Sequence, residues 1–469
     1  MPIEYTLCNL RVRTGLMQRR RIHPELVPSA RRLIGSLRDL GYDLTAAVAD
    51  LVDNSLAAEA ENVWIDMHFD GEDSWLRVAD DGWGMTECEL REAMRFGTRR
   101  KYAVGELGKF GLGLKAASLS QCRVLTVATR TTMKGRIRLA RWDLDHIERT
   151  DRWEILRPGR RQCRLATDAR LPGVGTVVLW QRLDRIARYR VPDGRRVQTE
   201  FERVRSEIAA QLGMLFHRFL AGESRRKIPL RILLNGKEIE SWDPYARSEA
   251  ATLKLPTQRL RVSVGGVRDV VEVRPYVLPT EARFSTSSAH RRAAGPALWN
   301  RQQGLYVYRS DRMIQSGGWS RLRTSDEHTK LARVSVDVPP TADELFELNV
   351  SKSQVRIPSF LRPELGAIAS SVARIAKDVY SEPAHGYISP NGHSVREQQA
   401  EAVRSLVHMV LSAAEEIIRE ELFHSELDRE RLLRRLRQME HEFQADLAAS
   451  AEPPSARLKE VAASLPGTA

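Results

Sequence analysis

The stretch Gly105–Lys115, GELGKFGLGLK, places four glycines within nine residues and ends in a lysine. Glycine has no Cβ, so a glycine-rich segment lets the backbone approach a ligand closely. A helix running through Ser120 is expected to follow, and its unpaired N–H groups and positive dipole end would face the loop. Such a loop is suited to binding an anion, and phosphate is the most common ligand of this kind of site.

Two common nucleotide-binding patterns do not fit this loop. Gly111-x-Gly113-x-x-Ala116 matches the dinucleotide fingerprint, but polar and charged residues precede it where a buried strand is required. The P-loop requires Gly-Lys followed by Ser or Thr, whereas Phe110 follows Lys109 here. Another kind of ATP site and a helix-capping surface loop without a ligand remain open from the loop alone.

A polar group lies upstream in DLVDNS, residues 50–55, within a predicted helix over 42–60. Asp50 and Asn54 are four positions apart and therefore share one face of that helix. An asparagine carbonyl oxygen suits Mg²⁺, and a carboxylate one turn earlier could position or deprotonate water. Taken singly, each residue could equally be a solvated or internally bonded polar group.

A second polar group, DDGWGM at residues 80–85, follows a predicted strand. One aspartate at a strand end could accept a hydrogen bond from an adenine amino group. The two glycines would allow close contact, and Met85 would supply soft apolar packing. The alternative is a plain turn.

Composition limits the class of protein. A chain of 469 residues is long enough for two to four domains. The net charge of +13 favours polyanionic partners, nucleic acid first, although a solvated arginine-rich surface is an equal alternative. No apolar run approaches the roughly 20 residues of a membrane span, and the N-terminus lacks a signal-like apolar segment. Four scattered cysteines fit reduced thiols, so we expect a cytoplasmic location.

Hydrophobic periodicity predicts an α+β protein. Up to about residue 183 the pattern indicates one mixed sheet with helices on one face. A long amphipathic helix is expected over 196–222, followed by a second mixed region with hairpins at Asn235-Gly236 and Ser310-Asp311. A helix over 361–380, a linker and a long C-terminal helix opened by the Ser394 capping box complete the prediction.

The three motifs ADLVDNS, DDGWGM and GKFGLGLK, in that order, closely resemble those of the Bergerat-fold (GHKL) ATPases. This superfamily includes gyrase B, MutL, the large heat-shock chaperones, histidine kinases and MORC proteins, and the chain is most similar to bacterial MORC-like ATP-binding proteins. Gly175-Thr176 at a strand start fits the last motif of the family. The second region resembles the ribosomal-protein-like βαβ transducer of the gyrase, MutL and MORC branch, so the resemblance covers about residues 30–380.

The resemblance implies a domain order that we adopt as an expectation. A Bergerat-fold ATPase sandwich would be followed by a connecting helix, a transducer and C-terminal helices. The expected segments are a basic arm (1–30), the ATP-binding domain (31–190), the connecting helix (191–225), the transducer (226–385), a helical region (394–449) and a disordered tail (450–469).

The resemblance also implies residue roles. Asn54 would coordinate the Mg²⁺ that bridges the ATP phosphates, and Asp80 would bind the adenine amino group. Lys352 would be the switch lysine that reaches the γ-phosphate from the transducer. The residues expected around the base are Gly82, Gly84, Met85 and Thr176. Those expected along the phosphates and in the lid over 97–108 are Thr98, Gly108, Lys109, Phe110, Gly111, Gly113 and Lys115.

One departure from the family pattern concerns the general base. The gyrase-like branch has a glutamate where this chain has Asp50, which is one methylene shorter. A misplacement of about 1 Å can cost on the order of a hundredfold in rate. We therefore expect slow hydrolysis, or ATP used mainly as a conformational ligand.

The resulting hypothesis is a slow Mg²⁺-dependent ATPase that acts as an ATP-gated homodimeric clamp or switch. DNA or RNA is a plausible client, in repair, chromosome handling or phage defence. The alternative is a non-hydrolysing scaffold that reads ATP and recruits a protein partner through its C-terminal helices. A histidine kinase fits poorly, because Pro24 directly follows His23 and disfavours a phospho-acceptor helix.

Overall fold

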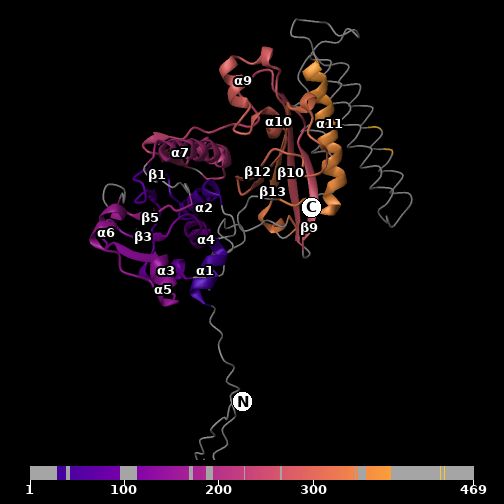
Figure 1. Ribbon diagram of the computed structural model, residues 1–469. Helices are drawn as coiled ribbons and strands as arrows, with labels where there is room; N and C mark the ends of the chain where they lie inside the picture. Colours follow the sequence, from indigo (N-terminus) through magenta and orange to yellow (C-terminus); the bar gives the residue numbers. More distant parts are fainter. Residues whose placement is uncertain are drawn as a thin grey trace, which may run out of the picture.

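A computed structural model of the protein contains two β-sheets in two neighbouring units (Figure 1). We call residues 30–239 the first unit and residues 240–381 the second unit, because a separate hydrophobic core lies in each. The structure describes residues 29–38, 43–95, 113–167, 173–185, 194–226, 228–264, 267–343, 345–346 and 355–381, together with 434 and 438.

The first sheet has seven strands within the described residues, in the order β4-β3-β5-β2-β1-β6-β7. Neighbouring strands are antiparallel except for β1 and β6, which are parallel. The strands are β1 (Asn62–His68), β2 (Trp75–Asp80), β3 (Val124–Arg130), β4 (Arg138–Asp143), β5 (Gly175–Gln181), β6 (Arg231–Leu234) and β7 (Lys237–Glu238). The α+β class with mixed sheets expected from the sequence is confirmed.

Helices cover both faces of the first sheet. Helices α2 and α4 pack on each other over one face, with α1 and α7 beside them. Helix α6 packs on the opposite face, where Ala166 joins Val177 and Leu179 of β5 in a small apolar cluster. The helices are α1 (Ala30–Arg38), α2 (Leu44–Ala57), α3 (Glu87–Met94), α4 (Gly113–Gln121), α5 (Leu144–Thr150), α6 (Arg160–Thr167), α7 (Arg195–Leu215) and α8 (His217–Leu220).

The expectation that helices cover a single face is therefore wrong for α6. Its sequence, RRQCRLAT, has few apolar residues, so periodicity gave no sign of a packed helix. The buried part of the cluster that α6 joins consists of alanines with Val177 and Leu179.

Local sequence explains where the two helices that flank the candidate site begin. The carboxylate of Asp43 accepts the N–H groups of Thr45 and Ala46 and so caps α2. Thr86 and Glu89 form a capping box at the start of α3. These caps fix the ends of the helices independently of the rest of the core.

The hairpin of β6 and β7 turns at Asn235-Gly236, both with positive φ, as the sequence predicts. Its place differs from the expectation. We assigned it to the second mixed region, whereas β6 pairs in parallel with β1 and extends the first sheet. The boundary expected at residue 226 therefore comes too early, because strand β6 lies after the connecting helix in sequence but within the first core.

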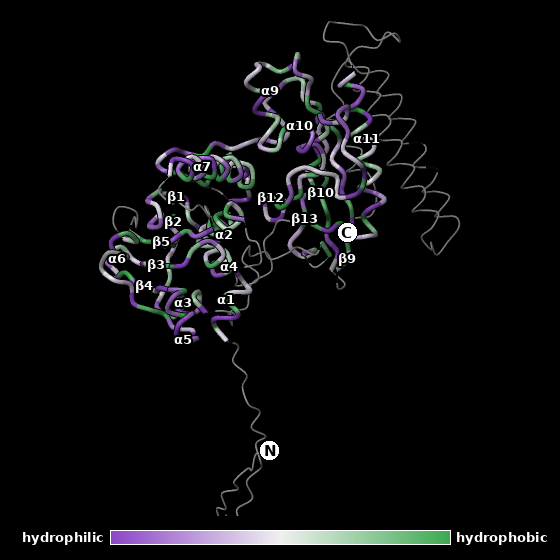
Figure 2. The backbone as a smooth tube through the Cα atoms, in the orientation of Figure 1, coloured by the Kyte–Doolittle hydropathy of each residue, from purple (hydrophilic) through white to green (hydrophobic). Residues whose placement is uncertain are grey.

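The second sheet has six strands within the described residues, in the order β12-β11-β13-β10-β8, with β9 paired to β10. Hydrophobic residues fill the layer where α11 packs on β10 and β13 (Figure 2). The strands are β8 (Leu253–Lys254), β9 (Gln258–Val264), β10 (Val267–Val277), β11 (Gly304–Arg309), β12 (Arg312–Ser316) and β13 (Ala332–Val338). The helices are α9 (Ser287–Ala293), α10 (Leu298–Gln302) and α11 (Arg362–Ser381), and short 3-10 turns lie at Glu281–Arg283, Glu327–Thr329, Pro340–Ala342 and Ser359–Leu361.

Several predicted segments lie outside the described residues. These are nearly all of the basic arm (1–30), the loop 96–112, the end of the transducer segment (382–385), the linker 386–393, the helix 394–449 apart from residues 434 and 438, and the tail 450–469. In the part of the chain that the structure describes, no helix is long and apolar enough to cross a membrane.

The two units meet along α7 and α8. The carbonyl of Gly213 on α7 accepts the N–H of Trp242 at 3.0 Å. His217 on α8 lies 2.8 Å from the Tyr308 hydroxyl of β11, and Arg218 pairs with Asp337 of β13. Burial holds the pKa of His217 well below its usual value, so a neutral imidazole lies at this joint.

Candidate functional site

The carboxylate of Asp80, at the end of β2, lies at the centre of a buried polar cluster. The backbone N–H groups of Gly82 and Thr176 donate to its Oδ1 at 3.1 and 3.2 Å. The hydroxyl of Ser55 on α2 donates to its Oδ2 at 3.1 Å. A carboxylate oxygen can accept more than one hydrogen bond, so Oδ2 retains capacity for a further donor.

Burial raises the pKa of Asp80 to about 6, and the donors from Gly82, Ser55 and Thr176 only partly oppose this effect. A strongly raised carboxyl pKa in a cluster of aimed donors is typical of functional sites. The neighbouring Asp81 has a different task. It accepts from the backbone N–H of Glu61 and from the backbone and side-chain amides of Asn62, and so fixes the turn after β2.

A second hydrogen-bonded group lies directly beside Asp80. The hydroxyl of Thr129 on β3 accepts the N–H of Met85 at 2.8 Å and donates to the carbonyl of Gly175 at 3.0 Å. It also lies 3.1 Å from the hydroxyl of Thr176. These contacts bring Met85 and Thr176 to the same edge as Asp80.

Two glycines of this edge are required by the backbone. Gly84 has φ +68°, and a Cβ there would lie 2.2 Å from the carbonyl oxygen of Arg130. Gly175 has φ +139°, and a Cβ there would lie 1.9 Å from the carbonyl oxygen of Asp80. Any side chain at either position would therefore displace the strand ends that carry the Asp80 cluster.

Helix α2 carries the other candidate residues of the first motif. Asn54 is exposed, while Asp50 is buried at 3 % relative exposure. The carboxylate of Asp50 faces the start of α4, where a Cβ on Gly113 would lie 3.8 Å from its Oδ2. The N-terminus of α4, the position expected to face phosphates, therefore lies beside Asp50.

Lys115 lies two residues further along α4. Its side chain is buried and its Nζ donates to the carbonyl of Arg95 at 2.6 Å. Burial lowers the pKa of Lys115 to about 8. The lysine therefore ties the start of α4 to the end of α3, where the segment expected to form the lid begins.

The structure thus brings together Asp50, Asn54, Asp80, Gly82, Gly84, Met85, Gly113, Lys115 and Thr176 around the ends of α2, β2, α4 and β5. The roles expected of Thr98, Gly108, Lys109, Phe110, Gly111 and Lys352 fall on residues outside the described part of the chain. For these six residues the assignment stays a prediction.

Sequence reasoning missed two polar residues of the cluster. Ser55 stands in the motif DLVDNS, but we assigned it no partner, whereas its hydroxyl contacts Asp80. Thr129 carried no signal at all, because a threonine in the strand pattern RVLTVATR is an ordinary β-forming residue.

The side-chain oxygen of Asn54 is the group of this site that could take part in holding a metal ion. Among the described residues, no group of three His, Cys, Asp or Glu side chains could hold a metal ion. Mg²⁺ is commonly bound by one or two protein oxygens together with substrate phosphates. The exposed side-chain oxygen of Asn54, one turn along α2 from Asp50, would supply one such protein oxygen.

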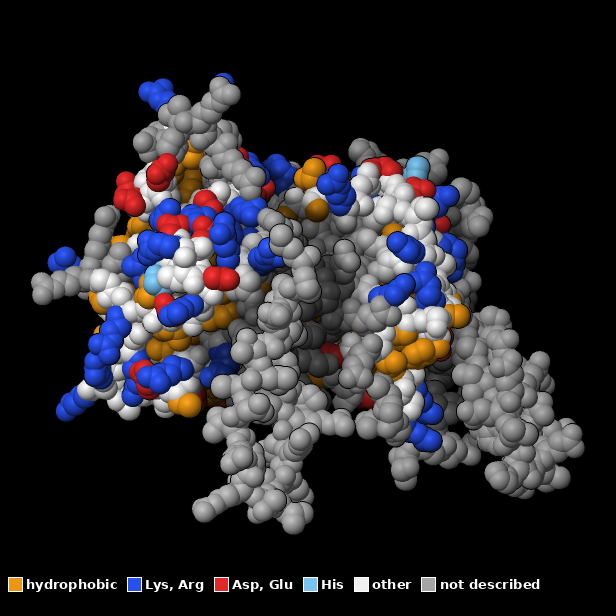
Figure 3. Space-filling model, turned by 60° about the horizontal axis from the view of Figure 1, so that its bottom comes forward, with side chains coloured by type: hydrophobic (Ala, Val, Ile, Leu, Met, Phe, Trp, Pro, Cys, Tyr) orange, Lys and Arg blue, Asp and Glu red, His pale blue; other side chains and the backbone are white. Residues whose placement is uncertain are grey.

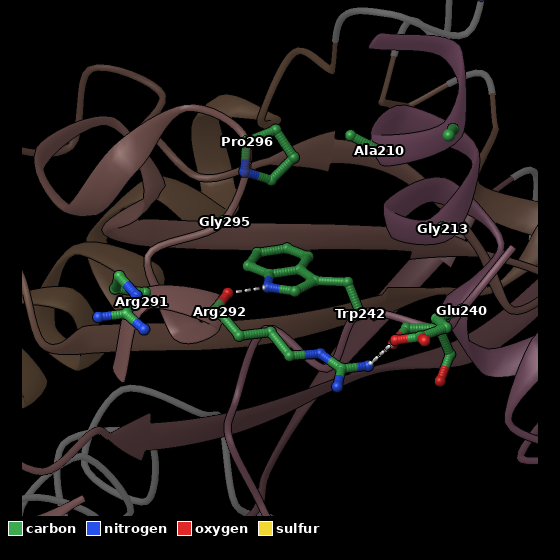
Figure 4. A pocket seen from close by; sticks show the side chains of 10 residues that line it. Ala210, Gly213, Glu240, Trp242, Arg291, Arg292, Gly295 and Pro296 are labelled. Atoms are coloured by element: carbon green, nitrogen blue, oxygen red, sulfur yellow. Dashed lines mark hydrogen bonds and ion pairs between the residues drawn. The ribbon is translucent and has the colours of Figure 1, made fainter. Parts of the chain in front are cut away.

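A cavity of about 330 Å³ lies elsewhere, between α7 and the second unit (Figure 4). The indole N–H of Trp242 donates to the carbonyl of Arg292 at its floor, and Arg292 pairs with Glu240. None of the residues that line it belongs to the polar cluster described above.

Comparison with known proteins agrees with this geometry. The family model described as "Histidine kinase-, DNA gyrase B-, and HSP90-like ATPase" matches residues 42–176. The ATPase morc-1 of Caenorhabditis elegans is 34 % identical over 85 residues, which are 18 % of this chain and 10 % of that relative. The chain thus spans about a tenth of the length of the curated relative it matches. Residues 42–176, which carry α2, the Asp80 cluster and the start of β5, are thus similar to the ATPase domains of this family.

Proposed function

We propose that the protein binds Mg²⁺-ATP in the first unit and hydrolyses it slowly, as an ATP-gated dimerising clamp. The observation that carries the proposal is the Asp80 cluster. A buried carboxylate with two backbone donors on Oδ1 and one hydroxyl on Oδ2 is pre-organised to accept an adenine amino group. Isothermal titration calorimetry with ATP, with and without Mg²⁺, tests the binding directly.

The phosphates would extend from the base toward α2 and α4. Asn54 would hold Mg²⁺ through its side-chain oxygen, and the N–H groups at the start of α4 would face the phosphate oxygens. Bound Mg²⁺ would neutralise the developing charge on the transferred phosphoryl group. Asp50 would orient or deprotonate the attacking water from the same helix.

The proposed clamp motion involves three segments outside the base-binding cluster. Residues 97–108 would form the lid, Lys352 would reach the γ-phosphate from the second unit, and the arm 1–30 would cross to a second copy. Contacts to a γ-phosphate order segments in this way in other switches. The buried His217–Tyr308 contact at the α7–α8 joint connects the second unit directly to the first.

Nucleic acid is the proposed client. Lys and Arg side chains gather on both units on the face drawn in Figure 3, with acidic side chains among them. The net charge of +13 supports attraction to a polyanion. The alternative function, a scaffold that reads ATP without hydrolysis, is favoured by the short Asp50 side chain.

One experiment separates the clamp from the scaffold. We expect ATP turnover to rise when double-stranded DNA is added, and the mass to double in a non-hydrolysable ATP analogue. Malachite-green phosphate assays and light scattering measure the two effects. A folded dimer that binds ATP and releases no phosphate would favour the scaffold, and a monomer in the analogue would contradict the clamp.

The raised pKa of Asp80 predicts a pH-dependent base preference. The ionised carboxylate accepts from the amino group of ATP, whereas the protonated acid can donate to the carbonyl of inosine triphosphate. With a pKa of about 6, the ionised fraction falls about tenfold between pH 7 and pH 5. The protonated fraction rises about tenfold over the same range, so we expect the affinity ratio of ATP to inosine triphosphate to fall by about a hundredfold, measured by calorimetry.

Titration of the phosphates does not affect this affinity ratio, because the two nucleotides carry the same phosphates.

The folding stability of the protein should change with pH in the opposite direction, and increase as the pH falls. The folded pKa of Asp80 lies above its usual value, so its stabilising contribution is full below about pH 4 and is lost as pH rises through about 6. A preference ratio that does not change with pH would contradict the assignment of Asp80 to the base.

A further inference from the structure

A buried ion pair joins α2 of the first unit to β12 of the second. The Nε of Arg312 lies 3.2 and 3.1 Å from the two carboxylate oxygens of Asp53. Both side chains are almost fully excluded from solvent, at 3 % and 2 % exposure. Because Asp53 and Arg312 belong to different units, the contact forms only when the units are assembled.

The guanidinium of Arg312 is held on other sides as well. Its Nη1 donates to the carbonyl of Met313 at 2.9 Å. The ring of Phe216, between α7 and α8, lies 5.6 Å from the guanidinium carbon. Helix α7 packs against both α2 and β12. The pair therefore lies at the junction of three elements, and its direction is fixed.

Asp53 lies on α2 between the two residues that we propose for catalysis and metal binding. It directly precedes Asn54, the proposed Mg²⁺ ligand, and follows Asp50, the proposed base, by three residues. At 1.5 Å rise per residue, Asp53 is about 4.5 Å along the axis from Asp50. A helix is rigid over one turn, so a displacement of Asp53 moves Asn54 and Asp50 with it.

Joining two units through a buried ion pair carries a desolvation cost. Withdrawing two charges from water is unfavourable, and an apolar pair of similar volume often holds elements together equally well. An ion pair adds direction, because a shift on the order of an ångström removes its hydrogen bonds. A contact of this kind is therefore better suited to fixing the position of α2 relative to β12 than to merely holding the two units together.

We propose that Arg312 is a positioning residue for the ATP site, and that the Asp53–Arg312 pair couples the orientation of α2 to the second unit. The inference rests on the proposed binding of Mg²⁺-ATP by the first unit. Coupling between sites is reciprocal, so nucleotide should also alter β12. The second unit would then respond to ATP through Asp53 as well as through any lysine that reaches the phosphate.

A double-mutant cycle on the full chain tests the proposal, with Asp53→Asn, Arg312→Met and both together. Each single variant should lower the thermal unfolding midpoint, because one change removes the partner of a buried charge. The double variant should regain most of that midpoint. It should still bind Mg²⁺-ATP about tenfold more weakly, within the range typical of coupled sites.

A second buried pair provides a matched control. Arg309 on β11 donates to both oxygens of Asp343, at 2.6 and 2.7 Å, and both side chains are buried within the second unit. The double variant with Arg309→Met and Asp343→Asn removes the same two chemical groups, and its arginine lies on the strand that pairs with β12. Its affinity for Mg²⁺-ATP should equal that of the wild type, since this pair joins two segments of the second unit and not the two units.

The outcomes separate the two proposals. Wild-type protein that does not bind Mg²⁺-ATP would overturn the proposed function. Wild-type binding together with an unchanged affinity in the D53N/R312M variant would overturn the inference alone, since a merely structural pair recovers fully in the double variant. Hydrogen exchange on the wild type keeps the test open if the variants do not fold. Mg²⁺-ATP should slow exchange in peptides covering residues 304–316, and unchanged exchange there would also overturn the inference.

Discussion

Replacing Asn54 with alanine is expected to abolish Mg²⁺-dependent binding of ATP. The side-chain oxygen of Asn54 is the protein ligand that we propose for the metal. A free Mg²⁺ ion keeps most of its waters and needs near-ideal oxygen geometry. Without this oxygen, the affinity measured by calorimetry in Mg²⁺ should fall to that measured in excess EDTA.

The matched control is Asn54→Asp, which keeps a hard oxygen at the same position and should retain Mg²⁺-dependent binding. Neither change should affect folding. Asn54 is exposed on α2, and surface substitutions typically stay within about 0.5 kcal/mol. Equal thermal midpoints with unchanged Mg²⁺-ATP affinity in N54A would remove Asn54 from the site.

Motif spacing predicted that the polar residues of the candidate site would lie near one another, because each motif lies on or beside a regular element of the first unit. DLVDNS lies on a helix, DDGWGM follows a strand, and Gly175-Thr176 opens another strand. Elements that end at one edge of a sheet bring their polar residues together. The residues of the second motif alone left open which aspartate would serve a ligand, and the family resemblance implied Asp80. The geometry is compatible with that expectation, because Asp81 fixes a turn through Asn62 while Asp80 is enclosed.

Tertiary pairing could not be predicted from local patterns. The β6–β7 hairpin carries a clear Asn-Gly turn, but nothing in its residues indicates that it pairs with β1 rather than with the second sheet. Thr129 joins the site only because β3 lies beside β5. Arg312 is one arginine among many in the sequence, and its partner lies 259 residues earlier.

Asp50→Asn is expected to stop ATP hydrolysis while leaving binding intact. Asparagine keeps the size of the side chain but cannot accept a proton, and a positioned general base typically contributes 10²–10⁴-fold. We therefore expect kcat to fall by about that factor, measured by phosphate release, with the Kd for Mg²⁺-ATP within about threefold of the wild type. Unchanged turnover would show that another group is the base.

Asp50→Glu tests whether reach limits the reaction. The carboxylate of Asp50 faces Gly113, where a Cβ would come no closer than 3.8 Å to it, so the start of α4 presents no side chain from that position. One added methylene should bring the carboxylate more than 1 Å nearer to the attacking water, and such a distance can be worth on the order of a hundredfold. We expect D50E to turn over faster than the wild type at equal affinity. Slower turnover in D50E would mean that α2 is already placed for the shorter side chain, and the cause of slow hydrolysis would then have to lie in the lid or in the coupling through Asp53.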